Sequence, residues 1–97
     1  MLDLRFEHFA DHVHQDFSAA TDLGDTSFTL ISAESLSKET PVNLTRPPFV
    51  LTFHNRSETL FPQSLYAMRH PELGTVDIFL VPVERGEPGF VYQAVFN

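Results

Sequence analysis

Two histidines near the N-terminus, His8 and His12, are four residues apart. On a helix this spacing places both imidazoles on one face, as metal ligands can be. Glu7, Asp11 and His14 lie close by, and two histidines with one carboxylate suit zinc or non-haem iron. The order of these residues is not the His-Glu-x-x-His of metalloproteases, so no motif places a general base. The simpler alternative is the solvated polar face of an amphipathic helix, without a metal.

His54 and His70 are the histidines outside this first segment. An imidazole can act as a general base near neutral pH, but a triad also needs a hydroxyl nucleophile on an activating turn. The sequence contains no Gly-x-Ser-x-Gly and no Cys, so neither a motif-placed serine nor a thiol is available. We therefore expect His54 to face water, His70 to bond the backbone of a turn, and the protein to be no enzyme and to need no cofactor.

The charge balance limits the partners. The 97 residues include 6 Lys and Arg against 13 Asp and Glu, a formal net charge of −7. Such a chain repels phosphate and anionic lipid, so we expect neither nucleic acid nor a membrane as partner. No apolar run approaches the ~20 residues of a membrane-spanning helix and no signal peptide is evident, which predicts a cytoplasmic protein. An apolar fraction of 42% predicts one folded domain over residues 1–97.

The secondary structure that carries these residues can be predicted from the spacing of the apolar side chains. Leu2, Phe6, Phe9 and Val13 recur at helical spacing, which predicts a short helix over roughly residues 3–13. Beyond it the period changes to two, with turn residues between the alternating runs. The runs are residues 16–21, 27–33, 49–54, 64–69, 75–83 and 90–96. We expect an all-β, mainly antiparallel fold, a six- to seven-stranded small barrel or sandwich with a short N-terminal helix.

Two of these runs are apolar on both faces, residues 75–83 and 90–96. A strand of this kind is usually central, so we expect residues 75–83 to form the most buried strand. A domain this small rarely covers both faces of two strands alone. Surplus apolar surface then indicates self-association or docking on another protein, and an ordinary Phe-rich core is the alternative.

The residues expected to form an interaction surface come from these strands and from one loop. Phe79, Val81 and Tyr92 would present apolar strand faces, and Pro47 with Pro48 would present a rigid loop.

Asp77 lies inside the most apolar run. If its side chain points inward it needs a partner, for which Arg46 or Arg69 is the candidate. If it points outward, the face that it shares with Phe79 and Val81 belongs to an interface.

Three stretches carry a resemblance to a known family. They are RPPFVLTF from Arg46, the run from Pro62 through HPELG to FLVP, and YQAVFN at residues 92–97. With Phe6, Phe9 and Phe17, they make nearly the whole chain resemble a group of small bacterial proteins catalogued as a domain of unknown function. The chain departs from that group at His14-Gln15, where a Gly is usual, which leaves the start of the first strand open.

The resemblance implies a small all-β domain without established activity or catalytic residues. It also implies a link to phage-tail-collar-type proteins. Together with the apolar strand faces, it predicts a non-enzymatic structural or protein-interaction module, in its narrower form an accessory of a phage-tail-like assembly. The alternative is a small-ligand or metal-binding β-barrel that uses His8, His12 and a Phe-lined interior.

Overall fold

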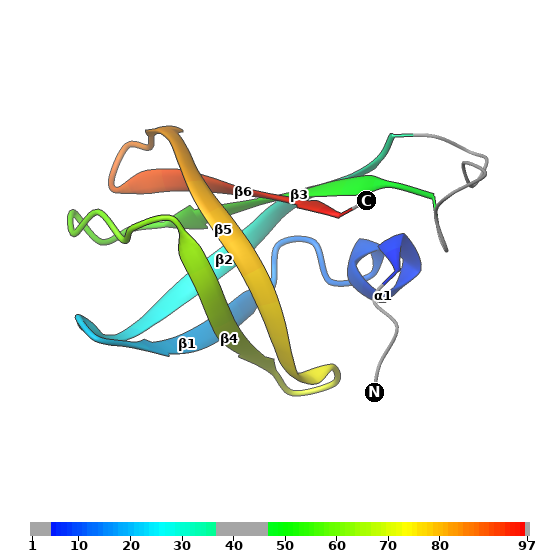
Figure 1. Ribbon diagram of the computed structural model, residues 1–97, viewed down its shortest axis with the longest axis horizontal. Helices are drawn as coiled ribbons and strands as arrows, with labels where there is room; N and C mark the ends of the chain where they lie inside the picture. Colours follow the sequence, from blue (N-terminus) through cyan, green and yellow to red (C-terminus); the bar gives the residue numbers. More distant parts are fainter. Residues whose placement is uncertain (1–4, 37–46, 97) are drawn as a thin grey trace.

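The structure, a computed structural model, describes residues 5–36 and 47–96, which form one short helix and six strands. The strands pair antiparallel and close into a barrel in the order β1-β2-β3-β6-β5-β4 (Figure 1). The predicted all-β fold with an N-terminal helix is confirmed, and of the two architectures expected it is the barrel that forms. The elements are α1 (Phe6–Ala10), β1 (Asp16–Thr21), β2 (Gly24–Ser35), β3 (Phe49–Asn55), β4 (Ser64–His70), β5 (Gly74–Arg85) and β6 (Phe90–Phe96).

Two antiparallel meanders make up the barrel. β1, β2 and β3 form the first and β4, β5 and β6 the second; β3 pairs with β6 and β1 with β4 to join them. The middle strand of each meander is 12 residues long and shifts register once, between Leu30 and Ser32 in β2 and between Pro82 and Glu84 in β5. Such irregularities bend a strand and help a sheet to curve into a barrel.

Side chains fill the interior of the barrel. The ring of Phe28 contacts those of Phe53, Phe61, Tyr66 and Tyr92, with centroid distances from 5.2 to 6.4 Å. A barrel of this strand number has an interior no wider than its side chains. The Phe-lined interior is therefore a packed core. Its largest fully buried side chains are Tyr92, Phe9, Phe17, Phe28, Phe49, Phe53, Leu30, Leu51, Met68, Ile78 and Leu80.

The prediction that residues 75–83 form the most buried strand is wrong. In β5 the side chains of Val76, Ile78 and Leu80 are buried, whereas Phe79 and Val83 are exposed. Among the strands of residues 5–36 and 47–96, β3 is the one without an exposed residue. The physical reason is that a barrel has one interior, so an apolar outward face stays in contact with water unless another element covers it.

The helix is shorter than predicted, because it ends at Ala10 and residues 11–14 form turns. His14 takes a φ of +74°, a conformation that a helix cannot contain. Its N–H donates to Leu30 O at 2.6 Å, which directs the chain into β1 beside β2. α1 covers the barrel end where Phe9 packs on Phe49 and Phe96 (Figure 1). Within residues 5–36 and 47–96, no helix is long and apolar enough to cross a membrane.

Candidate functional site

The pairing of β1 with β4 stops early. It consists of two residue pairs, of which Ala19 with Met68 is the last. β1 continues beyond this pair through residues 20–21, and β4 begins before it with residues 64–67. We call the region between residues 20–21 and residues 64–67 the open seam. In the ladder that joins β1 to β4, neither segment is paired with the other.

A groove of about 520 Å³ lies at the open seam. One wall is the end of β1 and the turn after it; the other is the segment before β4 and its first residues. Each wall carries an exposed leucine, with 59% of Leu23 and 60% of Leu65 accessible to solvent. Among the described residues of the lining, Asp22 alone is charged. The lining comprises Ala20, Thr21, Asp22, Leu23, Phe61, Pro62, Ser64, Leu65, Tyr66 and Ala67.

The first wall is held by the side chain of Thr21. Its hydroxyl donates to Gly24 O at 2.6 Å and accepts from Leu23 N at 3.0 Å. Gly24 has a φ of +106°, which favours glycine and closes the turn. The turn therefore fixes the backbone from which the Leu23 side chain projects.

The second wall is held by two tyrosines. Phe61 N donates to Tyr92 Oη at 2.9 Å, and Tyr66 Oη donates to Pro62 O. Burial raises the pKa of both phenols, so both stay protonated at neutral pH. The expectation that Tyr92 lies on an interaction surface is wrong, because it is fully buried and supports the groove wall from inside the barrel.

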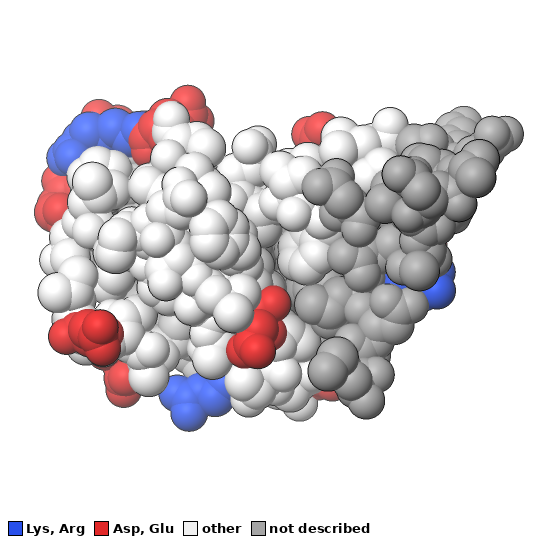
Figure 2. All heavy atoms as spheres, viewed as in Figure 1, with Lys and Arg blue, Asp and Glu red and all other residues white. Residues whose placement is uncertain are grey.

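The outer face of β4 and β5 continues from the groove. Leu65 lies opposite Phe79 in the β4–β5 ladder, and Phe79 is 47% exposed. Val81 follows on the same side and is half-buried. Asp77 lies opposite Ala67 in the β4–β5 ladder and is exposed. Its side chain therefore points outward, which is one of the two orientations considered from the sequence. Figure 2 shows that this face carries few charged groups and that most of them lie around its margin.

Pro47 and Pro48 do not belong to this surface. Both are half-buried and lead into β3, and Pro48 O accepts from Leu36 N at 2.9 Å. The next residue, Phe49, packs on α1 at the barrel end away from the groove. The structure therefore separates the proline loop from Phe79 and Val81.

A second cluster of polar side chains lies where β4 meets the entry to β1. Glu72 N donates to Nδ1 of His70, which leaves the proton of the neutral ring on Nε2. This Nε2–H donates to Gln15 Oε1 at 2.7 Å, and His12 Nδ1–H donates to the same oxygen at 2.9 Å. The ring of His70 also lies on that of Phe17, with centroids 4.9 Å apart.

Burial and the neighbouring His12 lower the pKa of His70, and Glu72 opposes the shift. The His70 ring therefore stays neutral at neutral pH and ties the start of β1 to the end of β4. Its expected bond to a turn backbone is confirmed.

His8 is not part of this cluster. Because α1 ends before His12, the two residues do not share a helix face. His8 Nδ1 accepts from Arg5 N at 3.0 Å, while His12 Nε2 lies 3.8 Å from Glu72 Oε2. In the described residues no group of three His, Cys, Asp or Glu side chains could hold a metal ion.

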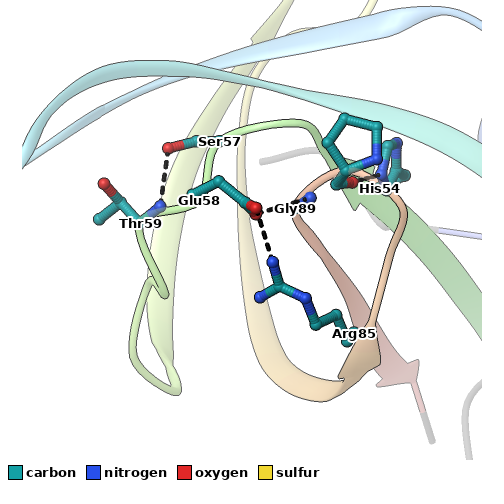
Figure 3. A network of polar contacts seen from close by, with 7 residues as sticks. His54, Ser57, Glu58, Thr59, Arg85 and Gly89 are labelled. Carbon is teal, nitrogen blue, oxygen red and sulfur yellow. Dashed lines mark hydrogen bonds and ion pairs between the residues drawn. The ribbon is translucent and has the colours of Figure 1, made fainter.

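His54 belongs to a polar network that fixes two loops (Figure 3). Its Nε2–H donates to Pro88 O at 2.6 Å in an exposed contact, so the half-buried His54 side chain lies at the surface, as expected, and also binds a loop. Glu58 accepts from Arg85 Nη2 at 2.6 Å and from Gly89 N at 3.0 Å. The network joins the β3–β4 loop to the β5–β6 loop, and the first of these leads into the groove wall.

The groove was not predicted from the sequence. One signal was present, because Leu23 is an apolar residue in the otherwise polar turn Asp22-Leu23-Gly24-Asp25. Turn positions are normally polar and wet, so an exposed leucine there indicates a contact made outside the core. The uneven pairing of β1 with β4 has no comparable sequence signal.

Comparison with known proteins shows the family to which the chain belongs. The model of a family described as "Domain of unknown function (DUF6916)" matches residues 4–96. A search of curated proteins found no match, and a search of solved structures found none either. The resemblance stated from the sequence, to a small family of unknown function, is thereby confirmed, while its link to phage-tail proteins gains no support. The chain belongs to the family of this domain of unknown function, DUF6916.

Proposed function

We propose that this domain is a non-enzymatic protein-interaction module whose docking surface is the outer face of β4 and β5 together with the adjoining groove. The observation that carries the proposal is the cross-strand pair of Leu65, which is 60% exposed, and Phe79, which is 47% exposed. Neither side chain is part of the buried core of the barrel. Large apolar side chains gathered on a face with few charges are typical of protein contacts.

The free energy available from Leu65 and Phe79 explains why we include the groove in the proposed docking surface. Burying the exposed parts of Leu65 and Phe79 is worth about 2–3 kcal/mol in total. A micromolar complex requires about 8 kcal/mol. A partner must therefore gain further contacts, and the groove beside Leu65 is the adjoining surface that can supply them.

The test is a selection of ligands from a displayed library of random 12-residue peptides, followed by affinity measurement with the variant Phe79→Glu. We expect the affinity of selected ligands to fall at least tenfold, because a carboxylate would be buried in the contact. Val95→Glu is the matched control: Val95 is 55% exposed on β6, outside the groove lining. Circular dichroism shows whether each variant keeps the fold.

Affinity that stays within twofold for Phe79→Glu, or that falls equally for Val95→Glu, would contradict the proposal. Failure to select any ligand that depends on Leu65 or Phe79 would do the same. An accessory role in a phage-tail-like assembly remains a narrower prediction. The alternative, a small-ligand or metal-binding barrel, has against it the packed interior and the separation of His8 from His12.

A further inference from the structure

The open seam leaves strand edges without a neighbour. Residues 64–67 of β4 are paired with β5 on one side, but the β1–β4 ladder on the other side ends at Met68. Residues 20–21 of β1 are likewise paired with β2 alone. In a strand paired on one side, alternate residues turn their N–H and C=O groups to the other side. These groups therefore face the groove that residues 64–67 line.

Exposed strand edges are usually protected by Lys, Pro or a bulge. The sequence Ser-Leu-Tyr-Ala at residues 64–67 has no such residue, and the β4–β5 register runs through it without a shift. The length is also suitable for an added strand, because four extended residues span about 13 Å. The edge is thus long enough to pair with a short extended segment.

We infer that the groove binds an extended, basic peptide segment of a partner protein, which adds to the edge of β4 as a further strand. This inference rests on the proposed function, of which it names the partner's chemistry and the mode of binding. Main-chain hydrogen bonds to β4 would hold the segment, and alternate side chains would contact the exposed leucines of the two walls.

The acidic groups at the groove favour a basic peptide as its occupant. Asp22 lines the groove, Asp25 is exposed at the other end of the same turn, and the whole chain carries −7. A second copy of the chain would bring another acidic surface against this one. A segment with Lys or Arg beside its apolar residues meets opposite charge instead, which favours both encounter and register.

The experiment uses a synthetic probe, acetyl-Lys-Val-Thr-Val-Thr-Val-Lys-amide, titrated into ¹⁵N-labelled protein and followed by NMR. We expect the amide signals of residues 20–21 and 64–67 to shift and their hydrogen exchange to slow. A matched peptide, N-methylated at alternate residues so that it cannot donate to β4, should bind at least tenfold more weakly. A second peptide with Glu in place of both Lys residues should bind at least threefold more weakly.

Two protein variants make the assignment specific. Leu23→Ser removes an apolar side chain from the groove wall and should weaken the probe at least threefold. Leu36→Ser is its matched control, because Leu36 is 54% exposed but lies outside the groove lining, beside Pro48. Asp22→Asn should reduce the difference between the Lys and Glu peptides.

Four results would overturn the inference. Equal binding of the N-methylated peptide would mean that side chains alone make the contact. Shifts outside the groove, or no binding of the probe, would mean that no strand is added there. Exchange protection that appears without peptide and rises with protein concentration would assign the groove to a second copy. If library ligands still depend on Phe79 in any of these cases, the proposed function survives and only the strand-addition mode is lost.

Discussion

The two places where the meanders join differ in how completely they close. β3 and β6 stay in register along the whole of β3, from Phe49 opposite Phe96 to Asn55 opposite Phe90. We call this pairing the closed seam. β1 and β4, by contrast, share two residue pairs and then separate at the open seam, around a groove.

Side-chain size accounts for part of this difference. In the closed seam the rings of Phe49 and Phe96 stack with centroids 4.6 Å apart, and cross-strand aromatic pairs each stabilise a ladder by about 0.2–1 kcal/mol. The next pair at the open seam would join Ala20 to Ala67, which offers little side-chain contact. One well-packed seam can thus hold the barrel while part of a strand edge stays unpaired at the other.

The most damaging change should come at the end of the closed seam. Gly89 has a φ of +80°, and a Cβ there would lie 1.9 Å from Asn55 O and 2.7 Å from the carbonyl carbon of Arg56. Because both are backbone atoms, Gly89→Ala must displace the strand end, and we expect a loss of about 3 kcal/mol in the free energy of unfolding. Urea denaturation measures it.

Gly74→Ala is the matched control at the first residue of β5, directly after the turn that follows β4. Gly74 has a similar φ of +73°, but a Cβ there meets nothing within 4 Å. Only the left-handed conformation then opposes the substitution, at about 1 kcal/mol. Equal losses for the two variants would show that the close approach at Gly89 does not matter and that the closed seam tolerates displacement.

A smaller effect is expected where the closed seam supports the groove wall. Tyr92→Phe leaves the buried N–H of Phe61 without its acceptor, which should cost about 1–3 kcal/mol and speed hydrogen exchange of the Phe61 amide. Tyr66→Phe removes a bond to Pro62 O, and Pro62 is exposed, so water can replace the lost donor. If Tyr66→Phe destabilises as much as Tyr92→Phe, water does not replace the hydrogen bond to Pro62 O and burial does not separate the two bonds.

The smallest effect concerns His70, beside the two residue pairs that join β1 to β4. The pKa of His70 lies below its ordinary value of 6.5, mainly because of burial. The unfolded chain therefore binds a proton at this residue before the folded one does. As the pH falls below 6.5, stability should decrease until the folded-state pKa is reached, because protonation removes the acceptor of Glu72 N.

Thermal unfolding across this pH range checks the prediction. His70→Gln can still donate to Gln15 but does not titrate, so its stability should change less with pH than that of the natural chain. His8→Gln removes an imidazole outside this cluster and is the control. A His70→Gln profile parallel to that of the natural chain would exclude His70 as the source of the pH dependence.

Much of the fold could be predicted because the signals are local. Alternation from Phe49 to His54 indicated β3, and the turn around Gly24 separated β1 from β2. The helix was predicted too long because its period continued to Val13, whereas His14 and Gln15 bond to β2. A periodic pattern in the sequence does not show that a distant strand binds the same backbone groups.

The candidate surface could be predicted only in part. Phe79 and Val81 were expected on an apolar face and lie on one, but Tyr92 was placed there wrongly. In β6 both alternating sets are apolar, Tyr92 and Phe96 in one and Val91 and Val95 in the other. Alternation then separates the two faces without showing which of them points inward.

Alternating side chains and turn residues thus define a small all-β domain from the sequence, because strand period and turn geometry depend on neighbouring residues. The inward face of each strand, the pairing of His70 with Gln15 and the early end of the β1–β4 ladder depend on the folded barrel. Each of them brings together segments far apart in the chain, 55 residues apart for His70 and Gln15. No local pattern encodes the register between such segments, since packing of the whole core sets it.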